Sequence, residues 1–113
     1  MLIEELNQFT GTENYYKHWL GQIVYTDGVK YLVDKAGAYW LIDLIASYQS
    51  TIKNVPFQVW VLKVNANKSA EATLHADADK PALVKQAIKY TTFPLDEIKL
   101  WLIDGVLILP SEY

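Results

Sequence analysis

Residues 54–64 read NVPFQVWVLKV. At Pro56 the hydrophobic pattern changes from a helical period to the alternation that is typical of a strand. The eight residues after it are rich in β-branched and aromatic side chains, which fit a pleated sheet. The pattern therefore predicts helices before this point in the chain and strands after it.

The segments that follow also have the character of strands. Apolar and polar residues alternate over 69–76 and again over 84–90. Residues 100–109 (LWLIDGVLIL) form two apolar arms around Asp104-Gly105, a dipeptide that favours a tight type I′ hairpin turn. Pro110 should end the pairing because proline has no N–H to donate. Together these segments predict about five antiparallel strands in a meander.

The first half of the chain predicts helices. A short amphipathic helix over residues 2–9 should end near Gly11, where glycine can adopt the left-handed cap. Thr26 or Asp27 can cap a helix over residues 28–35, and Gly37 turns the chain into a second helix over 38–53. Residues 14–25 have no clean period and are interpreted as extended or irregular.

The predicted fold is therefore α+β. The N-terminal helices, including the αα-hairpin, should pack on one face of the antiparallel sheet. No repeat, low-complexity tract or flexible linker interrupts residues 1–113, so we expect a single domain.

Composition excludes several classes of function. All ten basic residues are lysine, and the net charge is −3. Arginine is the side chain best suited to bidentate contacts with phosphate and guanine, so its absence argues against binding to nucleic acid or an anionic membrane. With no cysteine and only two histidines, the sequence predicts no disulfide, no metal site and no cofactor. The N-terminus lacks the pattern of a signal peptide, so we expect a cytoplasmic protein.

Three residues are candidates for catalysis: His18, Asp27 and Asp43. His18 lies among aromatic residues, and a histidine held by a carboxylate is a common arrangement for a general base. Asp43 interrupts the apolar run YWLIDLIA (residues 39–46), where a carboxylate needs a partner. No nucleophile motif accompanies them. The favoured interpretation is therefore structural, with His18 at the edge of the core and Asp43 paired to His18 or a lysine.

Aromatic residues are the candidates for contact with a ligand or a protein partner, because tyrosine and tryptophan are favoured at interfaces. They lie in the segment NYYKHW (residues 14–19), in the predicted helical hairpin and in the predicted strands. The candidates are Tyr15, Tyr16, Trp19, Tyr39, Trp60 and Trp101, of which Trp60 and Trp101 are expected on an uncovered part of the sheet.

Several segments together resemble a small family of uncharacterised bacterial proteins that also occurs in phage and plasmid settings. These segments are FTGTENYYKHWL, YTDGVKYL, AYWLIDLIASYQ and LPSEY. The resemblance implies a single compact domain. That family has no established reaction, cofactor or catalytic residue, and its association with mobile elements favours a protein partner from the host or a phage.

The leading hypothesis is a small non-enzymatic binding protein that self-associates or binds another protein. The alternative is a small enzyme or ligand-binding domain that places His18 and a carboxylate in an aromatic pocket. A small-molecule ligand is left open.

Overall fold

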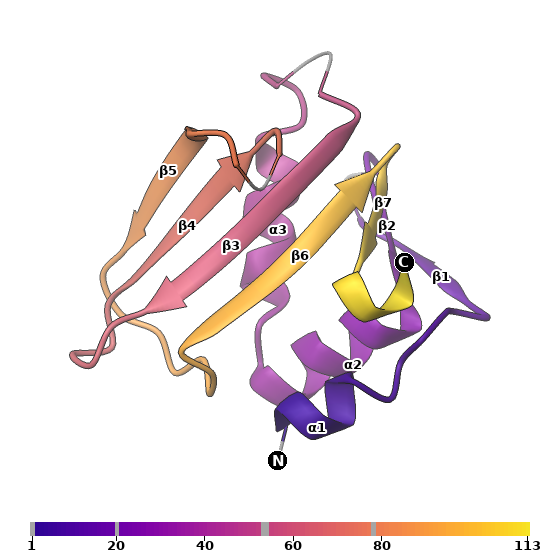
Figure 1. The fold of residues 1–113 in the computed structure, drawn as a ribbon, viewed down its shortest axis with the longest axis horizontal. Coiled ribbons are helices and arrows are strands. Elements are labelled where there is room, and N and C mark those ends of the chain that lie inside the picture. The colour runs from indigo at the N-terminus through magenta and orange to yellow at the C-terminus, as the bar shows by residue number, and fades with distance from the viewer. Residues whose placement is uncertain (1, 20, 53–54, 78) are drawn as a thin grey trace.

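The structure is a computed structural model that describes residues 2–19, 21–52, 55–77 and 79–113. The described residues form three α-helices, seven strands and a final 3₁₀ turn, which confirms the α+β class (Figure 1). In chain order these are α1 (Leu2–Leu6), β1 (Tyr15–Lys17), β2 (Val24–Thr26), α2 (Asp27–Ala36), α3 (Tyr39–Ser47), β3 (Phe57–Val64), β4 (Ala70–His75), β5 (Ala82–Ile88), β6 (Glu97–Ile103), β7 (Val106–Ile108) and η1 (Pro110–Glu112).

The sheet is mixed and larger than the sequence pattern predicts. Its order is β1-β2-β7-β6-β3-β4-β5, with β2 and β7 parallel and every other neighbouring pair antiparallel. The prediction of a five-stranded antiparallel meander is therefore wrong. After β5 the chain crosses back, and β6 pairs with β3 rather than with β5. The apolar character of β3 on both faces explains this, because such a strand is best buried between two neighbours.

The strands β1 and β2 lie almost entirely within residues 14–25, for which the sequence predicts extended or irregular structure. Each has only three residues, with Tyr16 opposite Tyr25 in an antiparallel pair. An alternation cannot be recognised over so short a run. β2 extends the sheet because it pairs in parallel with β7, which lies more than eighty positions later, with Val24 opposite Val106.

The helices α1 and α3 are shorter than predicted, whereas α2 is slightly longer. α1 ends at Leu6, and Gly11 is not among the glycines with positive φ. α2 is capped by Thr26 and ends at Ala36, and Gly37 (φ 62°) forms the left-handed C-terminal cap, as predicted. α3 ends at Ser47, whose hydroxyl donates to the carbonyl of Leu44 and so competes with the helical ladder. The predicted end at Lys53 lies outside the described residues, as do Asn54 and Ala78 of the predicted turns.

The core lies between the helices and one face of the sheet. Figure 1 shows α3 crossing behind the long strands, while their opposite face carries no helix in the described part of the chain. Trp60 is 2% exposed and contacts the ring of Tyr48 at the end of α3, with 5.9 Å between centroids. Trp60 is therefore a core residue, and the expectation that it lies on uncovered sheet is wrong. No helix in the described ranges is both long and apolar enough to cross a membrane.

The C-terminus is held against the N-terminus of α2. The Glu112 carboxylate accepts hydrogen bonds from the Thr26 hydroxyl (2.6 Å) and from the backbone N–H groups of Gly28 (3.2 Å) and Leu109 (2.9 Å). The free N–H groups and the dipole at this end of the helix both favour a carboxylate. Gly28 permits the approach, since a Cβ there would lie 2.7 Å from Glu112 Cδ and from Leu109 Cδ1.

We predict that Gly28→Ala destabilises the protein by about 1–3 kcal/mol, the usual cost of inserting a methyl group into a filled site. Alanine has the higher helix propensity by about 1 kcal/mol, but the new methyl group must displace the Glu112 carboxylate or the Leu109 side chain. Urea unfolding followed by circular dichroism measures the difference.

Gly11→Ala is the matched control, because nothing lies within 4 Å of a Cβ at that position. It should change the free energy of unfolding by less than about 0.5 kcal/mol. If Gly28→Ala were as stable as this control, the close contact between Glu112 and α2 would be wrong.

Candidate functional site

The structure brings two of the three catalytic candidates together. His18 follows β1, and its Nε2 lies 2.7 Å from Oδ1 of Asp43 on α3. The indole N–H of Trp19 donates to the same oxygen at 3.1 Å. The hydrogen bond from His18 holds the pKa of the Asp43 carboxyl below its ordinary value, against the opposing effect of desolvation, and the Trp19 bond adds to the lowering.

The burial of this pair is one-sided. The His18 side chain is 4% exposed, whereas the Asp43 side chain is 52% exposed. His18 also anchors the following turn, because its backbone N–H donates to Ile23 and its carbonyl accepts from Gly21. The arrangement therefore joins the β1–β2 connection to α3, with the imidazole at the edge of the core and the carboxylate at the surface.

Asp27, the third candidate, is separate from this pair and organises the segment before β1. Its carboxylate accepts from the Tyr16 hydroxyl (2.9 Å) and from the backbone N–H groups of Glu13 and Asn14. Partial burial raises the pKa of this carboxyl, but the hydrogen bonds from Tyr16, Glu13 and Asn14 outweigh it, so the pKa lies below its ordinary value. In the described part of the chain, the hydrogen bonds to the Asp27 carboxylate come from Glu13, Asn14 and Tyr16, so its role is structural.

The aromatic candidates do not form one surface. Tyr15 and Trp19 are exposed, while Tyr16 stacks on Tyr25 with 5.6 Å between centroids. Tyr39 lies at the start of α3, and its hydroxyl donates a hydrogen bond to the Asp34 carboxylate of α2. Trp101 lies on the open face of the sheet, with its ring 5.5 Å from that of Phe57 and 5.4 Å from that of Tyr113.

The open face of the sheet carries alternating charges. A hollow of about 580 Å³ covers parts of β6, β3, β4 and β5, and Val59 and Val61 lie among its lining residues. Lys63 lies directly opposite both Glu71 and Glu97. Opposite charges at facing positions stabilise a sheet, so this surface is largely compensated.

Besides the outer edges of the terminal strands β1 and β5, the sheet has an open edge along part of β6. β7 lies opposite only Trp101–Ile103 of β6, so the first half of the strand has a neighbour on one side only. The N–H of Val64 donates to the carbonyl of Asp96. In an antiparallel pair, successive residues direct their backbone groups alternately to one neighbour and to the other, so the even-numbered residues of β6 bond to β3. The backbone groups of Glu97 and Lys99 therefore point to the open edge, where no described residue lies opposite them.

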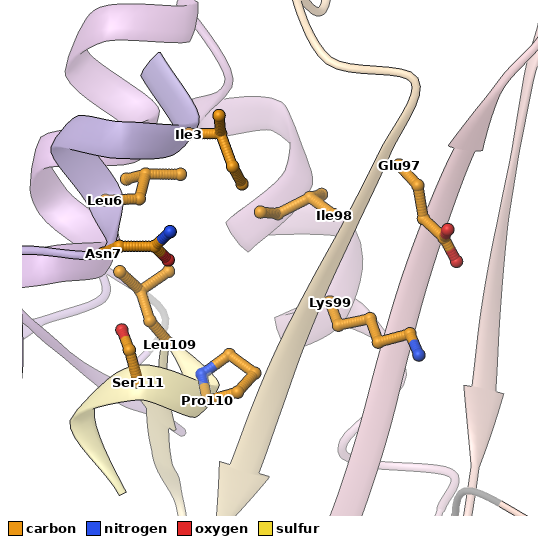
Figure 2. Close-up of a pocket in the computed structure, with 9 residues that line it drawn as sticks. All are labelled: Ile3, Leu6, Asn7, Glu97, Ile98, Lys99, Leu109, Pro110 and Ser111. Atoms are coloured by element: carbon orange, nitrogen blue, oxygen red, sulfur yellow. The ribbon is translucent and has the colours of Figure 1, made fainter. Parts of the chain in front are cut away.

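An apolar groove of about 300 Å³ runs along this edge (Figure 2). Figure 2 shows Ile3 and Leu6 of α1 directed towards Ile98 of β6, with Leu109 and Pro110 closing one end. Ile3 is 42% exposed, whereas Leu6, Ile98 and Leu109 are buried in its floor. The side chains of Glu97 and Lys99 project away from α1, to the open face.

Sequence reasoning did not find this groove or the role of Glu112. It began the hairpin at Leu100, whereas β6 begins at Glu97. The one available signal was Pro110, which limits the second arm of the hairpin and so leaves a longer first arm without a neighbour.

We predict that Asp43→Asn lowers the free energy of unfolding at neutral pH by about 0.5–1 kcal/mol, the range for a half-exposed carboxylate with a polar partner. Because the folded-state pKa of Asp43 is lowered from 3.8, its contribution is fully present above that value and is lost as the pH falls through the folded-state pKa. Urea unfolding at a series of pH values should therefore show the two proteins converging in acid.

Asp96→Asn is the control, since Asp96 is exposed in the connection before β6. Its difference from the wild type should stay small at every pH. A constant gap between wild type and Asp43→Asn down to the acid limit would contradict the contribution of the charge.

The comparisons with known proteins define the family without adding an activity. No curated protein and no solved structure matches the chain. A family model matches residues 1–113. The chain belongs to this family, which is described as a family of unknown function (DUF6876).

Proposed function

We propose that this protein works by binding another polypeptide chain, a segment of which adds as a strand to the open edge of β6. One observation carries the proposal. The backbone N–H and C=O groups of Glu97 and of Lys99 face an apolar groove instead of a neighbouring strand. Strand addition is a common mode of peptide recognition, in which backbone bonds supply affinity and a pocket supplies specificity.

The groove supports this proposal because it has the shape that a bound strand requires. On an added strand, the residues beside Lys99 and Glu97 face the open side of the sheet, and the residue between them faces Ile98. That central side chain enters the groove between α1 and Leu109. The lining of Ile3, Leu6, Ile98, Leu109 and Pro110 favours an aliphatic side chain there.

Natural proteins usually protect an open edge with a short strand, a proline, charges or a covering segment. Here Glu97 and Lys99 carry charges, and Pro110 follows the end of β7 and lines the groove beside this edge. An apolar groove beside an open edge favours binding over protection.

The alternative of a small enzyme has one observation in its favour, the 2.7 Å contact between His18 and Asp43. A general base must reach the proton it abstracts. The His18 side chain is 4% exposed, and its Nε2 is already bound to Asp43. The geometry therefore favours a structural role for the pair.

A capped peptide of alternating valine and threonine tests the proposal, with the same peptide N-methylated at every amide as the control ligand. In two-dimensional NMR, the first peptide should shift the amide signals of Glu97 and Lys99 and those of α1. The methylated peptide should not, because it cannot complete the backbone ladder.

Two variants locate the binding. Ile3→Asp places a charge in the groove wall and should weaken peptide binding about tenfold or more, equivalent to about 1.4 kcal/mol. Gln8→Asp makes the same change of charge in the same segment but outside the groove, and should leave the affinity unchanged. Absence of any shift at Glu97 and Lys99, or equal affinity for both variants, would contradict the proposal.

A further inference from the structure

The charges that flank the open edge of β6 have an order that identifies a partner. Reading along the strand, the open segment is Glu97-Ile98-Lys99, with Glu97 and Lys99 exposed on one face and Ile98 buried on the other. A strand that pairs antiparallel with it should place an acidic residue beside Lys99, an aliphatic residue beside Ile98 and a basic residue beside Glu97. Read from its own N-terminus, that strand has an acidic residue, then an aliphatic residue, then a basic residue.

This order is the order of Glu97-Ile98-Lys99 itself. We propose that the segment that adds to the edge of β6 belongs to a second copy of this chain, related by a two-fold axis that passes through Ile98. The inference rests on the proposed function, because it names the occupant of the same edge. In such a pair, Glu97 of one copy faces the partner's Lys99, and Lys99 faces the partner's Glu97.

The backbone geometry agrees with this register. In an antiparallel ladder, residues that exchange hydrogen bonds alternate with residues that do not. Glu97 and Lys99 both direct their N–H and C=O groups to the open edge, as the bond from Val64 to Asp96 fixes. Pairing each with the other across the axis uses all these groups, and it places Ile98 against its symmetry mate at a position without hydrogen bonds.

The side chains agree as well. Ile98 and its symmetry mate both lie on the helix side of the joined sheet, next to the groove formed with Ile3 and Leu6. Pairing through the axis therefore brings the two apolar grooves together. An isologous contact of this kind uses the same patch on both copies and closes after two chains, so it does not propagate into a fibre.

Charge reversal tests the inference. Glu97→Lys places lysine opposite the partner's Lys99, and Lys99→Glu places glutamate opposite the partner's Glu97. Because the axis repeats each mismatch, each single variant should dissociate about tenfold more readily or worse in sedimentation velocity across a concentration series. The double variant, Glu97→Lys with Lys99→Glu, restores both pairs and should dimerise like the wild type.

Mixing the two single variants gives the sharpest outcome. One chain then carries two lysines and the other two glutamates at the edge, so all facing pairs are attractive. At concentrations where the wild type just dimerises, each variant alone should be largely monomeric, and the mixture should form a heterodimer.

Two controls separate this result from loss of folding. Glu71→Lys places a lysine opposite Lys63, as Glu97→Lys does, but from β4 on the far side of β3. Lys85→Glu makes the change of Lys99→Glu on β5. Both controls should dimerise like the wild type, and thermal unfolding should show every variant folded.

The possible outcomes distinguish the inference from the proposed function. A wild type that stays monomeric at all concentrations, or a dimer that survives both single variants, overturns the second copy as the occupant. If the wild type is monomeric and the valine–threonine peptide still binds at Glu97 and Lys99, polypeptide binding stands with a different partner. If neither the peptide nor a second copy engages this edge, both ideas fail.

Discussion

The binding of Glu112 to the N-terminus of α2 is the interaction on which the arrangement of the chain depends. It joins residues 86 positions apart, through the 2.6 Å bond between Thr26 and Glu112. Three donors converge on one carboxylate at the positive end of a helix, where each hydrogen bond to a charge contributes about 1.5–3 kcal/mol. Gly28 is the condition for this contact, because any larger residue occupies the space that the carboxylate and Leu109 fill. The same carboxylate bridges Thr26 at the end of β2 and Leu109 after β7, next to the parallel pairing of these two strands.

The open edge of β6 follows from this interaction. If the last strand continued beyond Ile108, its next residues would run alongside Leu100 and Lys99, which is the register set by the pairing of Trp101 with Ile108. Pro110 cannot donate to Lys99, and Glu112 holds the chain end at α2 instead. The edge at Glu97 and Lys99 is thus left open beside an apolar groove. The contact that stabilises the C-terminus also creates the surface that we propose for binding.

The sequence predicts the local features of this fold better than its long-range pairings. Three local predictions are confirmed: the strand over residues 57–64, the Asp104-Gly105 turn and the Gly37 cap. Each of them depends on residues close together in the sequence. Asp104 and Gly105, for example, both have the positive φ that a type I′ turn needs. The partner of β6 could not be predicted, since nothing near residues 97–103 indicates whether β5 or β3 is its neighbour. The proximity of His18 and Asp43, 25 positions apart, was one of the alternatives that the residue types left open. Glu112 gave no signal at all, because a single carboxylate near a chain end has many solvent-exposed roles.

Hydrogen exchange of the β6 amides tests the central claim most directly, because it reads the open edge residue by residue. In dilute solution, the amides of Ile98 and Leu100 should be protected by their bonds to β3, while those of Glu97 and Lys99 exchange rapidly. As the protein concentration rises, Glu97 and Lys99 should become protected together, and Ile98 and Leu100 should not change. Four amides that are equally protected in dilute solution would contradict an open edge, and protection of Glu97 and Lys99 that never changes with concentration would contradict its use by a second copy.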